Sequence, residues 1–265
     1  MTGARPSVSV VIAVHNAEAF LASTLESVVR QRYPALEIIV VDDGSTDGSA
    51  AIVKACPGNV RYVFQRNAGP PAARNTGLRL ATGDLITFLD ADDLWTDDRL
   101  AVQLRLFAQS PAVDVVAGRF QWVRPADADG AGARFTPLAE PRNPLSLGTG
   151  LFRRRLFATV GELDEALWYS DDVDWYLRAR ELGIPMLVHD DVVLLYHRHD
   201  RNITNDEQRS RAFFLTALKK SLDRRRSHVG PSVRPLPSWL DFTSPVRPDA
   251  SPAPTMTTVD GKAVP

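Results

Sequence analysis

The sequence is poor in cysteine, since Cys56 stands alone among 265 residues. A single thiol excludes an internal disulfide and a thiolate zinc cluster, and it fits a reducing compartment. Long apolar runs are missing as well: the first one, residues 8–14, is interrupted by His15 and Asn16 and is too short to cross a bilayer. We therefore expect a soluble, cytoplasmic protein with at most peripheral membrane contact.

The chain carries no excess of charge of either sign, with 31 basic and 32 acidic residues. A balanced surface does not favour nucleic acid as a partner. Two phosphate-binding signatures are also lacking. There is no Gly-rich loop ending in lysine, which argues against a P-loop enzyme, and no GxGxxG after the first apolar run, which argues against a dinucleotide dehydrogenase.

Apolar runs alternate with amphipathic segments through the first half of the chain. Helices are expected over residues 17–31, with Asn16 as N-cap, and through Cys56, with Ser45 or Thr46 as cap. The apolar runs predict strands at residues 7–14, 37–41, 60–64 and 85–89. Because strands and helices alternate, we predict an α/β fold with a mostly parallel central sheet flanked by helices.

The second half of the chain is less regular. A helix opened by the acidic residues 171–174 should end at Gly183, and the Pro- and Gly-rich stretch 124–147 is either a loop near the functional site or an insertion. Strands are expected at residues 113–117, 120–123, 184–188 and 192–196.

Composition divides the chain into three parts. Residues 1–204 are expected to form one globular domain. Residues 205–229 hold a charged amphipathic helix that should pack on it. Residues 230–265 hold eight of the 19 prolines and show no apolar period, so we predict a disordered C-terminal tail.

Three carboxylates, Asp90, Asp92 and Asp93, follow the predicted strand 85–89. Parallel sheets place their ligands at the carboxyl ends of the strands. Acids this close repel one another unless a cation or hydrogen bonds compensate, and Mg²⁺ or Mn²⁺ typically joins such carboxylates to phosphate oxygens. Alternatively, Asp92 and Asp93 cap and charge the following helix.

Other polar side chains follow the neighbouring strands. They are His15 after the first strand, Asp42 and Asp43 after the second, and His197 and His199 after the last. Carboxylates can bind a base or a ribose, while a metal binds phosphate oxygens. The pattern indicates a nucleotide diphosphate held through a divalent metal.

These features belong to eight short motifs between residues 7 and 204. In chain order the motifs are Val10–Asn16, Val40–Asp47, Ala72–Gly77, Gly83–Asp84 with Leu89–Asp93, Phe152–Arg154, Val160–Asp164, Ser170–Trp175 and Tyr196–His199. As a set they resemble the inverting family 2 glycosyltransferases, which have the GT-A (Rossmann-like) fold. The resemblance implies a nucleotide-sugar donor, most often linked to UDP, and a divalent metal, Mn²⁺ or Mg²⁺.

The resemblance also implies roles for individual residues. Asp172 would be the general base, Asp92 and His199 the metal ligands, and His197 the alternative to His199. Ala13 and His15 would lie against the base, Asp43 would bind its uracil edge, Glu18 would support that pocket, and Asp90 would face the ribose. The residues assigned to nucleotide-sugar binding are Ala13, His15, Glu18, Asp43, Arg74, Asp90 and Ala91.

Several side chains allow two interpretations. Arg74 either approaches the diphosphate or pins its helix to a carboxylate. Asp171, Asp172 and Asp174 could simply be first-turn acids that the helix dipole stabilises. Trp95, Trp168 and Trp175 could stack on an acceptor sugar or pack in the core. The run Arg153–Arg155 could meet an anionic acceptor or form a solvated face. Lys219–Lys220 and Arg224–Arg226, on the last helix, could touch an anionic membrane.

The expected function is transfer of one sugar, a hexose or N-acetylhexosamine, to a hydroxyl acceptor with inversion. The chain departs from the family pattern at Leu163, where an aromatic residue is usual, and at Ser170–Asp171, where a Glu is usual beside the base. It also lacks the Gln-x-x-Arg-Trp motif and membrane helices of processive polymerases. A nucleotidyltransferase and a non-catalytic nucleotide-sugar binding module are the alternatives. The acceptor (glycan, lipid-linked sugar, small molecule or peptide) and the oligomeric state stay open.

Overall fold

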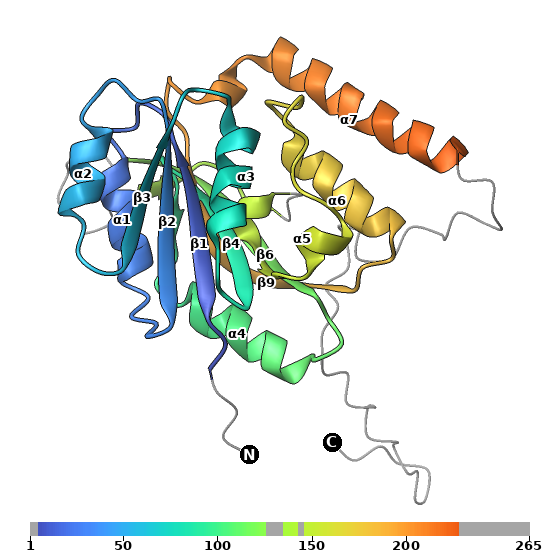
Figure 1. Ribbon diagram of the computed structural model, residues 1–265, viewed down its shortest axis with the longest axis horizontal. Coiled ribbons are helices and arrows are strands. Elements are labelled where there is room, and N and C mark those ends of the chain that lie inside the picture. The colour runs from blue at the N-terminus through green and yellow to red at the C-terminus, as the bar shows by residue number, and fades with distance from the viewer. Residues whose placement is uncertain (1–4, 126–134, 143–145, 228–265) are drawn as a thin grey trace, which may run out of the picture.

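The computed structural model describes residues 5–125, 135–142 and 146–227. Within these ranges the chain forms a nine-stranded sheet covered by helices on both faces (Figure 1). None of the described helices combines the length and the apolar character needed to span a bilayer. The predicted tail, residues 230–265, lies outside the described residues, and the division into domains stays a prediction.

The first half of the chain forms a parallel sheet in the order β3-β2-β1-β4. β1, β2 and β4 are apolar and mostly buried, whereas the edge strand β3 is partly exposed. All four strands run in the same direction. Their carboxyl ends therefore share one edge, which the functional motifs occupy. The strands are β1 (Val8–Val14), β2 (Leu36–Asp43), β3 (Val60–Gln65) and β4 (Leu85–Asp90).

The second half adds a mixed extension beyond β4. β8 pairs antiparallel with β4 and β6, β9 runs parallel to β6, β5 pairs antiparallel with β9, and β7 with β6. The sheet is thus parallel in its first four strands and mixed beyond them. The added strands are β5 (Leu94–Trp95), β6 (Val115–Pro125), β7 (Phe135–Pro137), β8 (Gly150–Arg153) and β9 (Met186–His197).

Two pairs of predicted short strands are continuous in the structure. Residues 113–117 and 120–123 fall in or beside β6, and 184–188 and 192–196 in or beside β9. The break in the apolar pattern is a bulge, because the β6–β9 register shifts between Ala117 and Phe120. A Cβ on Gly118 would stand 2.6 Å from Cγ1 of Val193, so only glycine lets the strands approach there.

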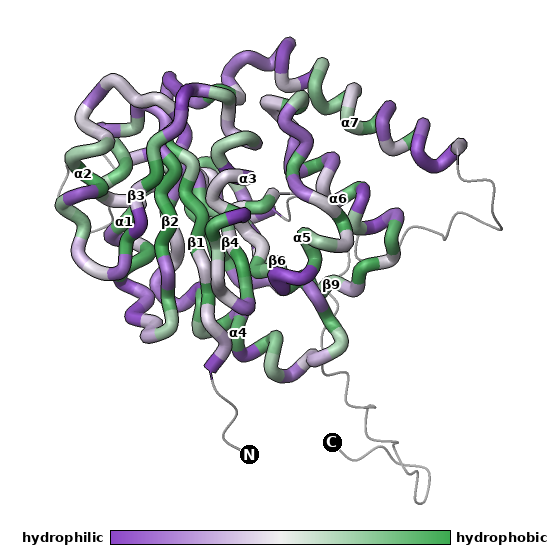
Figure 2. The backbone as a smooth tube through the Cα atoms, in the orientation of Figure 1, coloured by the Kyte–Doolittle hydropathy of each residue, from purple (hydrophilic) through white to green (hydrophobic). Residues whose placement is uncertain are grey.

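Alternate residues of the central strands face two separate hydrophobic layers. Val10 and Ile12 pack with α1, α2 and α4, whereas Val11 and Phe88 pack with α3, α5 and α6. Figure 2 shows these strands as the hydrophobic centre of the molecule. The helices are α1 (Leu21–Val29), α2 (Ser49–Ala55), α3 (Pro70–Leu80), α4 (Arg99–Gln109), α5 (Leu156–Thr159) and α6 (Asp171–Glu181), with 3₁₀ turns η1 (Leu147–Thr149) and η2 (Ile203–Asn205).

The two predicted helix caps are wrong. Helices α1 and α2 follow Phe20 and Gly48, without a side-chain cap. Instead, Asn16 has a φ of 50°, and its side-chain oxygen accepts a hydrogen bond from the Thr46 backbone at 2.8 Å. Ser45 in turn accepts one from the Asn16 backbone at 3.0 Å. These polar residues tie the loops after β1 and β2 together, and this use outweighs local capping.

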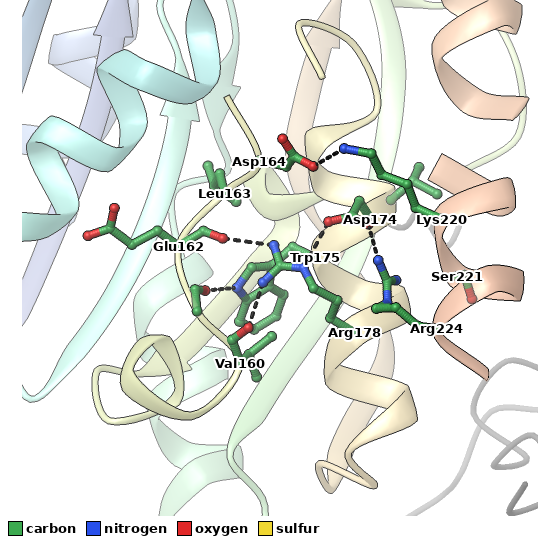
Figure 3. A network of polar contacts seen from close by, with 12 residues as sticks. Val160, Glu162, Leu163, Asp164, Asp174, Trp175, Arg178, Lys220, Ser221 and Arg224 are labelled. Atoms are coloured by element: carbon green, nitrogen blue, oxygen red, sulfur yellow. Dashed lines mark hydrogen bonds and ion pairs between the residues drawn. The ribbon is translucent and has the colours of Figure 1, made fainter. Parts of the chain in front are cut away.

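The last helix, α7 (Glu207–Ser227), lies along the outside of α6. Polar contacts join the two helices and the loop before α6 (Figure 3). Arg224 binds Asp174 at 3.0 Å, Ser221 donates to Glu181 at 2.6 Å, and Lys220 pairs with Asp164. The inward face of α7 is therefore committed to packing.

Candidate functional site

A cleft of about 480 Å³ opens at the carboxyl edge of the parallel strands. Its walls are the ends of β1, β2 and β4, the starts of α3 and α6, and the segment from His199 to Ser210. Because the strands are parallel, residues far apart in the sequence meet there. The sequence-predicted residues that line it are Ala13, His15, Asp43, Arg74, Asp90, Ala91, Asp92, Asp172 and His199.

Asp43 anchors one end of the cleft. Its carboxylate accepts hydrogen bonds from the Gln65 side chain at 2.7 Å and from the backbones of Ala68 and Gly69, both at 2.9 Å. His15 lies beside it, with Nδ1 2.9 Å from the Asp43 carbonyl oxygen. Asp43 thus both lines the cleft and shapes the loop that closes it.

Glu18 lies behind this pocket rather than in it. Its carboxylate accepts a hydrogen bond from the Gly48 backbone at 2.7 Å, and its own N–H donates to Asp47 at 3.0 Å. These contacts hold the loop after β2. Glu18 can therefore act on a ligand only through the loop it supports.

Arg74 bridges two acids from different elements. Its guanidinium donates to Asp90 at 2.6 Å and to Asp171 at 2.8 Å, and its side chain is 14 % exposed. Burial raises the pKa of Asp171, and the Arg74 charge opposes that rise. Of the two interpretations of Arg74, the structure shows the carboxylate contacts: the arginine joins α3 to β4 and α6.

Asp172 stands in the first turn of α6, next to Asp171. One of its oxygens accepts a hydrogen bond from the Val173 backbone at 2.7 Å. Burial, followed by the Asp171 charge, raises its pKa to about 7. A carboxylate with that pKa can take up a proton near neutral pH, as a general base must.

Asp92 and His199 meet in the same cleft. The His199 Nε2 lies 2.9 Å from an Asp92 oxygen, and Asn202 donates to the same oxygen at 3.3 Å. The Phe20 ring stacks on His199 with centroids 4.2 Å apart, which fixes the imidazole plane. Burial, then the Asp90 charge, raises the pKa of Asp92. A positive ion at this point would relieve that cost.

The neighbours Asp93 and His197 have a structural role. Asp93 is buried and accepts a hydrogen bond from the His197 backbone at 2.9 Å. The His197 ring is buried and does not line the cleft, and its Nε2 has no hydrogen-bond partner among the described residues. Of the two histidines named by the sequence, the structure brings His199 to Asp92.

A divalent metal fits the residues present. In the described part of the chain no group of three or more His, Cys, Asp and Glu side chains is arranged to hold an ion. The pair Asp92–His199 offers one carboxylate oxygen and one imidazole nitrogen, and Mg²⁺ and Mn²⁺ commonly complete such a set with phosphate oxygens and water. The site suits an ion shared with a diphosphate.

The three tryptophans considered as acceptor contacts differ in their exposure to solvent. Trp95 and Trp175 are buried in the core, whereas Trp168 is 47 % exposed and lines the cleft. Trp168 covers Gly69, which has a φ of 94° and where a Cβ would stand 2.7 Å from the indole. The trio Arg153–Arg155 lies elsewhere and binds carbonyl oxygens and Asp114. Only Trp168 of these can stack on an acceptor.

Sequence reasoning missed two asparagines that hold the site. Asn75 is buried and exchanges two 2.9 Å hydrogen bonds with the backbone of Leu163, fixing the loop before α6. It follows Arg74 in one of the eight motifs, which was a usable signal. Asn202 binds Asp92 and the His197 carbonyl, and only its closeness to His199 pointed to it.

Comparison with known families agrees with this geometry. Residues 9–159, more than half of the chain, match the model for glycosyl transferase family 2. The chain belongs to this family. The recognition made from the eight motifs is confirmed.

Curated relatives of this family 2 chain are named as glycosyltransferases. An uncharacterized glycosyltransferase of Nostoc is 30 % identical over 182 residues, 61 % of this chain and 55 % of the relative. A putative teichuronic acid biosynthesis glycosyltransferase of Bacillus subtilis is 37 % identical over 113 residues, 41 % of this chain and 45 % of the relative. The chain spans about half the length of these two relatives.

Solved structures confirm the fold. Residues 1–349 of S. aureus TarS, in complex with UDP-GlcNAc, superpose with a TM-score of 0.63 at 22 % identity, over 76 % of this chain and 61 % of that one. The mannosyltransferase PcManGT of Pyrobaculum calidifontis, in complex with GDP-Man and Mn²⁺, gives 0.65 at 22 % identity, over 83 % and 65 %. The family 2 chain thus has the predicted GT-A fold.

Proposed function

We propose that this family 2 protein transfers one sugar from a nucleotide sugar to a hydroxyl acceptor, with inversion. One observation carries the proposal: a carboxylate with a pKa near 7, Asp172, lines the same cleft as the Asp92–His199 pair. A binding module needs no base of this kind. The activity, donor and acceptor of the whole protein remain proposals.

The donor is proposed to be a UDP-linked hexose or N-acetylhexosamine. Ala13, His15 and Asp43 would receive the base, with Glu18 holding the loop behind them. Asp90 keeps a partly exposed carboxylate (44 % of its side chain) although Arg74 binds one of its oxygens, so the other can accept a ribose hydroxyl. The structural neighbour TarS, bound to UDP-GlcNAc, supports this choice. The neighbour PcManGT, bound to GDP-Man, makes a GDP-linked donor the alternative.

Asp92 and His199 would hold the divalent ion, Mn²⁺ or Mg²⁺. When bound, such an ion stabilises the negative charge that develops on the leaving diphosphate. Asn202 and Phe20 fix the orientation of both ligands before the donor arrives. The protein's own contribution is this preorganisation.

Asp172 would take the proton from the acceptor hydroxyl as that oxygen attacks the anomeric carbon opposite the diphosphate. The C–O bond to the acceptor forms while the bond to UDP breaks, so one displacement inverts the centre and needs no covalent sugar–enzyme intermediate. Asp171 neutralises Arg74, and its charge keeps Asp172 basic enough to act. Trp168 offers a flat apolar surface for the acceptor.

Incubation with UDP-sugars, Mn²⁺ and pooled hydroxyl acceptors tests the proposal. Acceptor-dependent release of UDP, lost in Asp172→Asn, is the expected result. Release of pyrophosphate would identify a nucleotidyltransferase. Donor binding without turnover across the acceptor pool would favour a binding module.

A further inference from the structure

The outward face of α7 has no partner in the described structure. Its packing face, with Ala217 and Ser221 buried, turns towards α6. Leu215 and Leu222 lie seven residues apart, and therefore on one side of the helix, and are 55 % and 46 % exposed. A single exposed leucine needs no explanation, but two on the same side of a helix, opposite its packing face, can form part of an interaction surface.

Basic residues border this stripe. Arg211 and Lys219 stand one turn before and after Leu215, and Arg226 stands one turn after Leu222. All three are exposed and form no ion pair with another described residue. The sequence analysis grouped Lys220 with Lys219 and Arg224 with Arg226, yet Lys220 and Arg224 both turn inward to acids (Figure 3). Fewer basic residues of α7 therefore face outward than the sequence suggested, and those that do lie next to the two leucines.

We propose that this face of α7, defined by Arg211, Leu215, Lys219, Leu222 and Arg226, docks on an anionic lipid membrane. Cations are attracted to acidic headgroups, while the leucines can enter the boundary between headgroups and acyl chains. A second copy of the chain is a poorer partner, because the same cations would face each other. Nucleic acid would leave the leucines uncovered.

The position of α7 gives the docking a consequence. Arg209 and Ser210, in its first turn, line the cleft, and the Tyr169 ring at the cleft wall stacks on Phe213 with centroids 5.3 Å apart. The helix that would meet the membrane therefore also forms part of the cleft wall. The inference concerns binding alone and does not depend on the proposed sugar transfer.

Co-sedimentation of the full chain with vesicles tests the inference. We expect binding to phosphatidylcholine vesicles containing phosphatidylglycerol, little binding to phosphatidylcholine alone, and release by high salt. The double variant Arg211→Glu/Lys219→Glu should raise the lipid concentration for half-binding by at least about 20-fold, from a factor of roughly five for each charge lost. Leu215→Ser/Leu222→Ser should also weaken binding.

Matched variants elsewhere control for net charge and apolar area. The double variants Arg61→Glu/Arg105→Glu and Phe64→Ser/Leu138→Ser change as many exposed charges and as many exposed apolar side chains outside α7, and they should bind as the unchanged protein does. Thermal melting of each variant separates lost binding from lost folding. Absence of vesicle binding, or equal binding by the α7 variants, would overturn the inference. So would a dimer that the leucine variant dissociates, because the face would then be a contact between copies.

Discussion

His199 and Asp92, 107 residues apart in the chain, stand 2.9 Å from each other at the cleft. If this pair holds the divalent ion, His199→Gln should raise the dissociation constant for Mn²⁺, measured with UDP present, at least about tenfold. Isothermal titration calorimetry gives this value directly. The matched control is His197→Gln, which alters a histidine that does not line the cleft. Equal affinities in the two variants would remove His199 from the metal site.

Asp172→Asn should lower kcat by about 10²–10⁴-fold, because the amide cannot accept the acceptor's proton. The dissociation constant for the UDP-sugar should change little, since Asp172 is not among the residues assigned to the donor. Steady-state kinetics with calorimetry on the same samples measures both. Loss of donor affinity with unchanged kcat would place Asp172 in the donor site instead.

The raised pKa of Asp172 predicts a pH dependence of activity. A general base acts only when ionised, so kcat should rise with pH up to about 7 and then level off. In the acidic limb the fall should approach about tenfold per pH unit. A flat profile between pH 5 and 7 would contradict the assignment, as ordinary carboxylates titrate near pH 4.

The same shift predicts a stability effect. The folded-state pKa of Asp172 lies above its unfolded value of 3.8, so its stabilising contribution is present below pH 4 and is lost as pH rises through 7. Asp172→Asn removes a buried negative charge and its repulsion by Asp171, so this variant should melt at a higher temperature than the unchanged protein at pH 8. At pH 4 the two melting temperatures should be nearly equal. Calorimetric scans at both pH values check this.

Arg74→Met should destabilise the fold by about 3–5 kcal/mol, because it leaves Asp90 and Asp171 uncompensated and partly buried. It should also move the acidic limb of the activity profile to higher pH, since Arg74 lowers the pKa of Asp172. Arg79→Met on the same helix breaks an exposed pair with Glu162 and should cost less than about 1 kcal/mol. Urea unfolding compares the two. Similar losses of unfolding free energy in the two variants would show that the contacts of Arg74 with Asp90 and Asp171 do not stabilise the fold more than an exposed ion pair does.

The sequence by itself determined the fold class and the location of the site. The β-branched runs ending at Val14, Val41 and Leu89 require burial on both faces, so a parallel sheet with polar residues at one edge follows from local chemistry. The strand extents were less certain, because the bulge at Gly118 interrupts the apolar period without ending β6. The caps at Asn16, Ser45 and Thr46 failed because a partner loop competes for those side chains.

Tertiary structure alone decided how the charged residues share their contacts. Whether Arg74 meets a phosphate or a carboxylate, which histidine reaches Asp92, and which tryptophan stays exposed all depend on packing between segments about 100 residues apart. Local propensity contains no information on such distances. The outward face of α7 also depends on packing. The sequence shows seven basic residues in this helix, but only the packing on α6 shows that Lys220 and Arg224 already bind acids.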